Sequence, residues 1–267
     1  MHSKLIILFL FMTSILFENA KAASDKTYIV FQSGFSSCSK DLDLDPRGSN
    51  VYEPMNHLLL RLKLKGIDFE HSTSCFPFDL DPKVVRYYLK DKKGELQSDH
   101  AEIYSEKLAA SIKASGARNL VIISHSHGAW LAMKQIINDK FKDLNILFIS
   151  LDAISMKNCS PPVFVRNMFI NTTPFGPVFE ECREFPTDFN LSDLKKIKEE
   201  TSKWINIYQD DYYYIQSTRN MFADKNYNFD IELDILANQH ASQPNNKRIQ
   251  NLVYKGILDL YKTKELR

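Results

Sequence analysis

The sequence predicts an α/β fold in which helices cover both faces of a mostly parallel central sheet. Short apolar runs rich in β-branched residues alternate with longer stretches of helical spacing, which is typical of parallel strands joined by helices. Removal of an amino-terminal signal from the 267 residues leaves about 245, a length that suits one domain with a sizeable core. No internal repeat or low-complexity tract suggests a second unit.

The first half of the chain predicts two strands, each followed by a helix. The apolar run Tyr28–Phe31 is the first strand, and leucines at helical spacing in 55–65 predict a helix that Gly66 ends. A second strand is expected over 67–71. Apolar residues at helical spacing in 99–114 then predict an amphipathic helix.

The middle of the chain predicts a strand, a tight turn and a helix in direct succession. Leu120–Ile123 is apolar and β-branched, the turn carries Ser126, and a helix-compatible stretch covers 129–141. The next apolar run, Leu144–Leu151, predicts a further strand that ends in a turn at Asp152.

The pattern loosens after Asp152. An excursion from the sheet is expected over about 153–202, of the kind that forms a lid or cap over a substrate site. Strands are expected again over 204–208 and 229–236, followed by a helix over 246–261. Five prolines break the regularity of the excursion: Pro161, Pro162, Pro174, Pro177 and Pro186.

The tight turn reads Ser124-His125-Ser126-His127-Gly128 and meets the steric demands of a nucleophile on a strand-to-helix turn. Such a turn requires small residues two positions before and after the nucleophile, which Ser124 and Gly128 supply. On these residues the chain resembles the α/β-hydrolase superfamily, and its lipase and esterase branches in particular. The familiar pattern there is G-x-S-x-G, from which this chain departs by a serine at the first position.

The resemblance implies a Ser-His-Asp triad in which Ser126 is the nucleophile. The chain order of the superfamily requires the acid and the histidine to follow the serine. His240 is expected as the base because it follows the last predicted strand, and Asp152 as the acid because it ends the strand after the turn. Asp210 and Asp211, which follow the next strand, are the alternative acids.

The two histidines beside the serine have other expected roles. The side chains of His125 and His127 should point away from Ser126, so neither is expected to be the base. The backbone N–H of His127, at the start of the helix, should face an oxyanion formed at the serine. The second oxyanion donor is expected to be the backbone N–H of Phe35, where Gly34 permits close approach of the backbone.

The amino terminus predicts export to the periplasm or the exterior. Residues 1–22 combine Lys4, an apolar segment shorter than the roughly 20 residues that span a bilayer, and a small-residue cleavage pattern at Ala20-Lys21-Ala22. The expected mature chain is a single α/β-hydrolase domain over 23–267, with the excursion as its cap.

Four cysteines follow the signal, and in an exported chain they favour two disulfides over free thiols or a metal site. Three pairings are open from the sequence. The preferred one joins Cys38 to Cys75, because both lie just past the ends of predicted parallel strands, and Cys159 to Cys182, which would hold the excursion.

The charge balance argues against nucleic acid as a partner. Without residues 1–22 the chain carries 32 basic and 32 acidic residues and no long basic tract. The resemblance implies a secreted hydrolase of carboxylic esters or lipids that needs no metal or organic cofactor and contacts a lipid surface only transiently. A thioesterase or peptidase on the same scaffold, and a non-catalytic binding protein of this fold, are the alternatives, because fold does not fix function.

Overall fold

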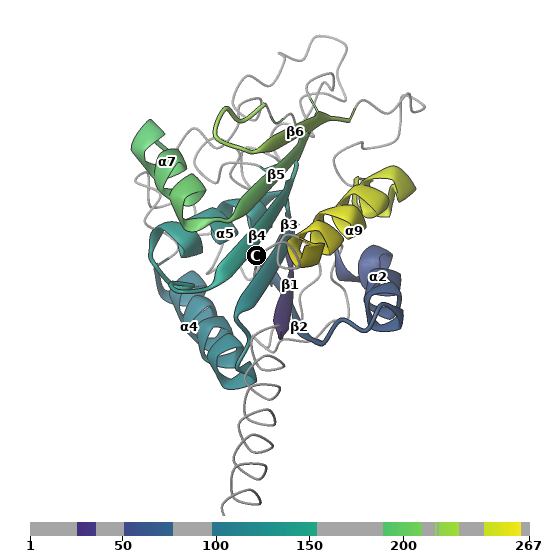
Figure 1. Cartoon of the computed structure of the whole chain (residues 1–267). Coiled ribbons are helices and arrows are strands. Elements are labelled where there is room, and N and C mark those ends of the chain that lie inside the picture. Colours follow the sequence, from purple (N-terminus) through teal and green to yellow (C-terminus); the bar gives the residue numbers. More distant parts are fainter. Residues whose placement is uncertain are drawn as a thin grey trace, which may run out of the picture.

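Six parallel strands form the central sheet, and helices lie on both of its faces (Figure 1). The computed structural model describes residues 26–35, 51–76, 98–153, 189–209, 217, 219–229 and 243–262. Within these ranges the strand order is β2-β1-β3-β4-β5-β6, and every neighbouring pair is parallel. The predicted parallel α/β architecture is therefore confirmed.

The elements alternate along the chain as a parallel sheet requires. The strands are β1 (Thr27–Phe35), β2 (Phe69–Phe76), β3 (Asn119–His125), β4 (Asn145–Leu151), β5 (Lys203–Tyr208) and β6 (Lys225–Asn228). The helices are α2 (Tyr52–Leu64), α4 (Ser98–Ser115), α5 (His127–Ile137), α7 (Leu191–Glu200) and α9 (Lys247–Lys262), and a 3₁₀ turn, η2, covers Gln243–Asn245.

Two elements were not predicted from the sequence. One is the polar strand β6 at 225–228, which pairs with β5; of the strand predicted over 229–236, residues 230–236 lie outside the described ranges, so that strand stays a prediction. Helix α7 lies inside the range predicted as an irregular excursion. Its Leu194 and Ile197 are buried in the core, so this helix belongs to the layer that covers the sheet.

Each face of the sheet has its own apolar core. Helices α4, α5 and α7 cover one face, and α2 and α9 cover the other (Figure 1). The strands supply alternate residues to the two cores, so that Val30 packs with α4 and α5 while Ile29 packs with α2 and α9. Burial on both faces explains why the central strands are continuous apolar runs.

A row of polar side chains crosses the face covered by α4, α5 and α7. The backbone register aligns its five members side by side on five strands. Hydrogen bonds join neighbours in the row: Ser150 Oγ donates to Asn206 Oδ1 at 3.0 Å, and Asn206 Nδ2 donates to Asn226 Oδ1 at 3.0 Å. We call these residues the polar row; they are Gln32, Ser124, Ser150, Asn206 and Asn226.

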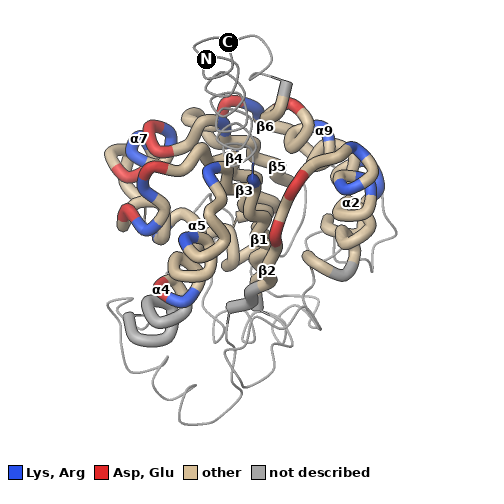
Figure 2. Tube along the Cα trace, turned by 60° about the horizontal axis from the view of Figure 1, so that its bottom comes forward, with Lys and Arg blue, Asp and Glu red and all other residues tan. Residues whose placement is uncertain are grey.

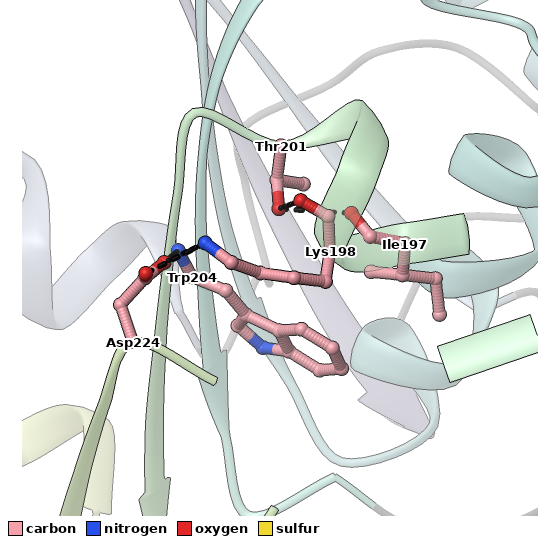
Figure 3. A network of polar contacts seen from close by, with 5 residues as sticks. All are labelled: Ile197, Lys198, Thr201, Trp204 and Asp224. Atoms are coloured by element: carbon pink, nitrogen blue, oxygen red, sulfur yellow. Dashed lines mark hydrogen bonds and ion pairs between the residues drawn. The ribbon is translucent and has the colours of Figure 1, made fainter. Parts of the chain in front are cut away.

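Asp224 joins α7 to the edge of the sheet (Figure 3). Its carboxylate accepts hydrogen bonds from Lys198 Nζ at 2.6 Å and from the backbone N–H of Trp204 at 2.8 Å. Burial by itself raises the pKa of Asp224, but these two hydrogen bonds and the charges of Lys198 and Lys203 outweigh burial, and the pKa lies below its usual value. The carboxylate of Asp224, the residue before β6, thus accepts a backbone hydrogen bond from β5.

Charged residues of the described ranges belong mostly to the helices and the ends of the strands, and both signs occur along α7 (Figure 2). Interspersed charges of this kind give a solvated surface. None of the helices within the described ranges is both long enough and apolar enough to cross a bilayer.

Candidate active site

Ser126 stands between the last residue of β3 and the first residue of α5, in strained backbone. Its φ is 59° and its ψ is −132°, a region that costs a residue with a side chain about 1–3 kcal/mol. Its N–H donates to the carbonyl of Leu151 at 3.0 Å, and its own carbonyl accepts from the N–H of Ala129 at 3.0 Å. Strand β4 and helix α5 together hold this serine in the sharp turn that a nucleophile on such a sheet requires.

Gly128 allows α5 to begin directly against β1. A Cβ atom at this position would lie 2.5 Å from the carbonyl oxygen of Gln32 and 2.6 Å from that of Ser33. Both contacts are with backbone, which cannot move aside without displacing the strand. The small residue two positions after Ser126 is therefore a packing requirement of the turn.

Ser124 fills the position two residues before Ser126. Its side chain is completely buried, and its Oγ donates to the carbonyl of Ile149 in β4 at 3.2 Å. The hydroxyl is thus satisfied inside the sheet, which explains how a serine can stand where the familiar pattern has glycine.

Gly34 brings the backbone of β1 against Ser126. A Cβ atom here would lie 2.5 Å from Ser126 Cβ and 2.8 Å from Ser126 Oγ. The pairing of β1 with β2 shifts between Ser33 and Phe35, so Gly34 stands at an irregularity of the strand. Phe35 is the next residue in β1, and the role of its backbone N–H as an oxyanion donor stays a prediction.

The side chain of His127 does not point away from the serine, and the sequence prediction on this point is wrong. Its Nδ1 lies 3.4 Å from Ser126 Oγ, and the residue is buried as the first residue of α5. The tight turn bends the chain so sharply that adjacent side chains meet. His125 belongs to β3, where it pairs in register with Leu151.

Asp152 follows β4 in the same way that Ser126 follows β3. Its φ is 46°, and the residue is completely buried. Its N–H donates to the carbonyl of Ile207 at 2.7 Å, its Oδ2 accepts from Gln209 Nε2 at 2.7 Å, and its Oδ1 accepts from Ser217 Oγ. The carboxylate is therefore fixed by side chains that follow β5.

Sequence reasoning did not identify Gln209 or Ser217. Both are completely buried, and the N–H of Ser217 donates to the carbonyl of Gln209 at 3.1 Å. Neither belongs to a motif, and only the position of Gln209 directly after a predicted strand marks it as a residue of the carboxyl edge of the sheet.

Several predicted site residues lie outside the described ranges, and their roles stay predictions. They are the base His240, the alternative acids Asp210 and Asp211, the signal 1–22, most of the excursion, and the cysteines Cys38, Cys159 and Cys182; of Cys75 the backbone in β2 is described. Phe229 and Gln243, which border the segment with His240, are both buried. Within the described ranges, no group of three His, Cys, Asp or Glu side chains could hold a metal ion.

The sheet order and the serine turn fit the α/β-hydrolase fold. No protein-family model matches the sequence, and no curated protein matches it. Among solved structures, one of the metagenome-derived lipolytic enzymes LipS and LipT has 11% sequence identity and a TM-score of 0.45, covering 90% of this chain and 94% of that one. The Pyrococcus furiosus esterase Pf2001 has 10% identity and a TM-score of 0.45, covering 88% and 83%. A likeness at this level does not indicate what this chain cleaves or binds.

Proposed function

We propose that the protein is a hydrolase of carboxylic esters that uses Ser126 as its nucleophile. The observation that carries the proposal is the backbone of Ser126, which is held at positive φ between β3 and α5 with Gly34 packed against its side chain. Strain of this kind destabilises the fold and is kept where a hydroxyl must be presented to a substrate.

In the proposed reaction, His240 takes the proton from Ser126 Oγ while the oxygen attacks the ester carbonyl carbon. The bond from that carbon to the leaving alkoxide oxygen then breaks, and His240 returns the proton to the leaving alcohol. Water attacks the acyl-enzyme with His240 again as base, which releases the carboxylic acid and restores Ser126. Backbone N–H groups of His127 and Phe35 are the proposed donors to the oxyanion.

Asp152 is the proposed acid that orients His240 and stabilises its cation. Its position supports this role, because Asp152 directly follows β4 as Ser126 directly follows the neighbouring strand β3. Its complete burial supports it as well, since a buried carboxylate is favoured only where it is hydrogen-bonded or paired with a cation. Asp210 and Asp211 are the alternatives.

Labelling with a fluorophosphonate tests the nucleophile. Peptide mass analysis should find one adduct per chain on Ser126, abolished by Ser126→Ala and slowed by several orders of magnitude in His240→Ala. Loss of the adduct in Asp152→Asn, with labelling retained in Asp210→Asn and Asp211→Asn, would assign the acid; the reverse pattern would reassign it. A folded wild-type protein that forms no adduct would overturn the proposal in favour of a binding protein.

Turnover of matched substrates tests the reaction class. A short-chain oxygen ester, the corresponding thioester and the corresponding anilide differ only in the leaving group. The proposal expects the highest kcat/KM for the oxygen ester. A preference for the thioester or the anilide would instead support a thioesterase or a peptidase on the same nucleophile.

Export and disulfide formation are further parts of the proposal. Residues 1–22 are proposed to be removed as a signal, leaving a chain with Cys38–Cys75 and Cys159–Cys182 bridges. The intact mass of the protein from cell fractions, measured with and without reduction, tests cleavage, location and bridge number together. A chain that keeps residues 1–22 or has free thiols would contradict this part alone.

A further inference from the structure

We propose that Gln209 and Ser217 are positioning residues that orient the Asp152 carboxylate for its role in the triad. The inference rests on the proposed function and extends it to two residues that no sequence motif marks. The geometry behind it is a set of three hydrogen bonds. Gln209 Nε2 donates to Asp152 Oδ2 at 2.7 Å, Ser217 Oγ donates to Asp152 Oδ1, and the N–H of Ser217 donates to the carbonyl of Gln209 at 3.1 Å.

The backbone of Asp152 is tied to β5, the strand that precedes both donors in the chain. Its N–H donates to the carbonyl of Ile207 in β5 at 2.7 Å, and Gln209 is the first residue after β5. Hydrogen bonds to the backbone N–H and to both carboxylate oxygens oppose rotation of this side chain.

Both donors are uncharged, and this matters for the chemistry. An amide and a hydroxyl fix the direction of a carboxylate without placing a second charge beside it. A lysine or arginine in their place would fix the carboxylate equally well but would oppose the formation of an imidazolium beside it.

The two donors stand on either side of residues 210–216 in the chain, and both Gln209 and Ser217 are completely buried. Mutations that remove one of these donors should alter the orientation of the acid before they alter the stability of the sheet, whose core residues lie elsewhere.

Ser217→Ala and Gln209→Leu test the inference through the rate of fluorophosphonate labelling. Each should slow the reaction of Ser126 about tenfold or more while the final stoichiometry stays at one, with kcat reduced and KM within about twofold. Ser217→Thr keeps the hydroxyl and should restore the rate. The matched control Thr201→Val removes another buried, hydrogen-bonded hydroxyl, at the end of α7, and should lower the unfolding temperature without changing the rate.

Gln209→Glu supplies a readout that a merely structural role would not give. It places a second carboxyl group beside Asp152, and two carboxylates this close cannot both ionise. At low pH one proton shared by the two carboxyl groups replaces the amide hydrogen bond, and this proton is lost as the pH rises. The ratio of the variant's kcat/KM to that of wild type should therefore be highest at low pH and fall as the pH rises. A ratio that does not change with pH would overturn the inference.

The outcomes separate the inference from the proposed function. A wild-type protein without an adduct on Ser126 would overturn both. A labelled wild-type protein whose Ser217→Ala and Gln209→Leu variants react at the wild-type rate would overturn the positioning role alone. Slower labelling of Ser217→Ala and Gln209→Leu, together with a pH-dependent ratio of Gln209→Glu activity to wild-type activity, would support both.

Discussion

Ser126 and Asp152 occupy equivalent positions on neighbouring strands, and both have positive φ, 59° and 46° respectively. Each is the first residue past its strand, because the paired residues His125 and Leu151 are the last of β3 and β4. A further hydrogen bond, from the N–H of Ser126 to the carbonyl of Leu151, extends the ladder to the serine. The pairing of β3 with β4 therefore fixes the positions of the proposed nucleophile and the proposed acid relative to each other at the carboxyl end of the sheet.

Gly34→Ala should inactivate the protein without unfolding it. The new Cβ would lie 2.5 Å from Ser126 Cβ and 2.8 Å from Ser126 Oγ, so the serine side chain must move. A displacement near 1 Å at a reacting atom lowers the rate about a hundredfold. Fluorophosphonate labelling rate and thermal unfolding, measured on the same sample, check this expectation.

Gly66→Ala is the matched control for that substitution. Gly66 has φ +73°, and no atom lies within 4 Å of the position that a Cβ would occupy, so alanine here strains only the backbone. It should lower the stability by about 1 kcal/mol and leave labelling unchanged. If Gly34→Ala labels as fast as Gly66→Ala, the close approach of β1 has no catalytic consequence.

Gly128→Ala should destabilise the whole domain. The Cβ would collide with two backbone carbonyls of β1, which forces α5 away from the sheet. Overpacking of this kind costs about 1–3 kcal/mol. Urea unfolding should show the loss as a lower midpoint.

Gly256→Ala in α9 provides the comparison. Its Cβ would lie 2.9 Å from the terminal methyl group of Ile205, which is the movable end of a side chain. Alanine also favours a helix by about 1 kcal/mol over glycine, so the net change in stability should be small. An equal loss in the two variants would contradict the distinction between backbone and side-chain clashes.

His127→Asn should leave the reactivity of Ser126 within about tenfold of wild type. The contact between His127 Nδ1 and Ser126 Oγ is long, at 3.4 Å, and the backbone N–H proposed for the oxyanion is retained. His240→Gln should instead reduce labelling by roughly three or more orders of magnitude, as expected for loss of a triad base. The reverse order of the two effects would make His127 the base.

Asp224→Asn should make the free energy of unfolding less dependent on pH in the acidic range. Because the pKa of Asp224 is lowered in the fold, the unfolded chain binds more protons as the pH falls. The contribution of Asp224 is thus complete above its unfolded pKa and is lost as the pH falls through its folded value. Urea midpoints measured between pH 7 and pH 3 should fall less in the variant than in wild type.

Asp139→Asn is the control for this pH dependence. Asp139 pairs with Lys196 at 3.1 Å, but both side chains are largely exposed, so the pair contributes little. The variant should follow the wild-type curve. A curve for Asp224→Asn that coincides with that of Asp139→Asn would show that the link between α7 and β5 does not depend on charge.

The parts of the fold that could be predicted are those whose residues carry a local signal. Strands β3 and β4 are continuous apolar runs, and the turn at Ser126 is constrained by its small neighbours. Helix α7 had a weaker signal. It buries only Leu194 and Ile197, and the capping box between Asn190 and Asp193 was its one clear mark after a proline-rich stretch.

Other features depend on contacts that no local pattern encodes. Strand β6 is polar and, among the described strands, pairs with β5 alone, so it lacks the alternation expected of a half-buried strand. Gln209 and Ser217 are eight positions apart, and their shared contact with Asp152 and the hydrogen bond between them exist only in the folded chain. The contact of His127 with Ser126 follows from a backbone turn whose dihedral angles the sequence does not state.

The polar row distinguishes the native strand alignment from misfolded ones. A slip of β4 against β5 by two residues would keep apolar side chains on their own faces, so the two cores oppose it only weakly. It would, however, break the hydrogen bond between the buried side chains of Ser150 and Asn206. The same slip would move Asp152 about 6.6 Å along the strand relative to Ile207, whose carbonyl accepts from the N–H of Asp152. Fidelity of folding and the placement of the proposed acid therefore depend on the same few buried side chains.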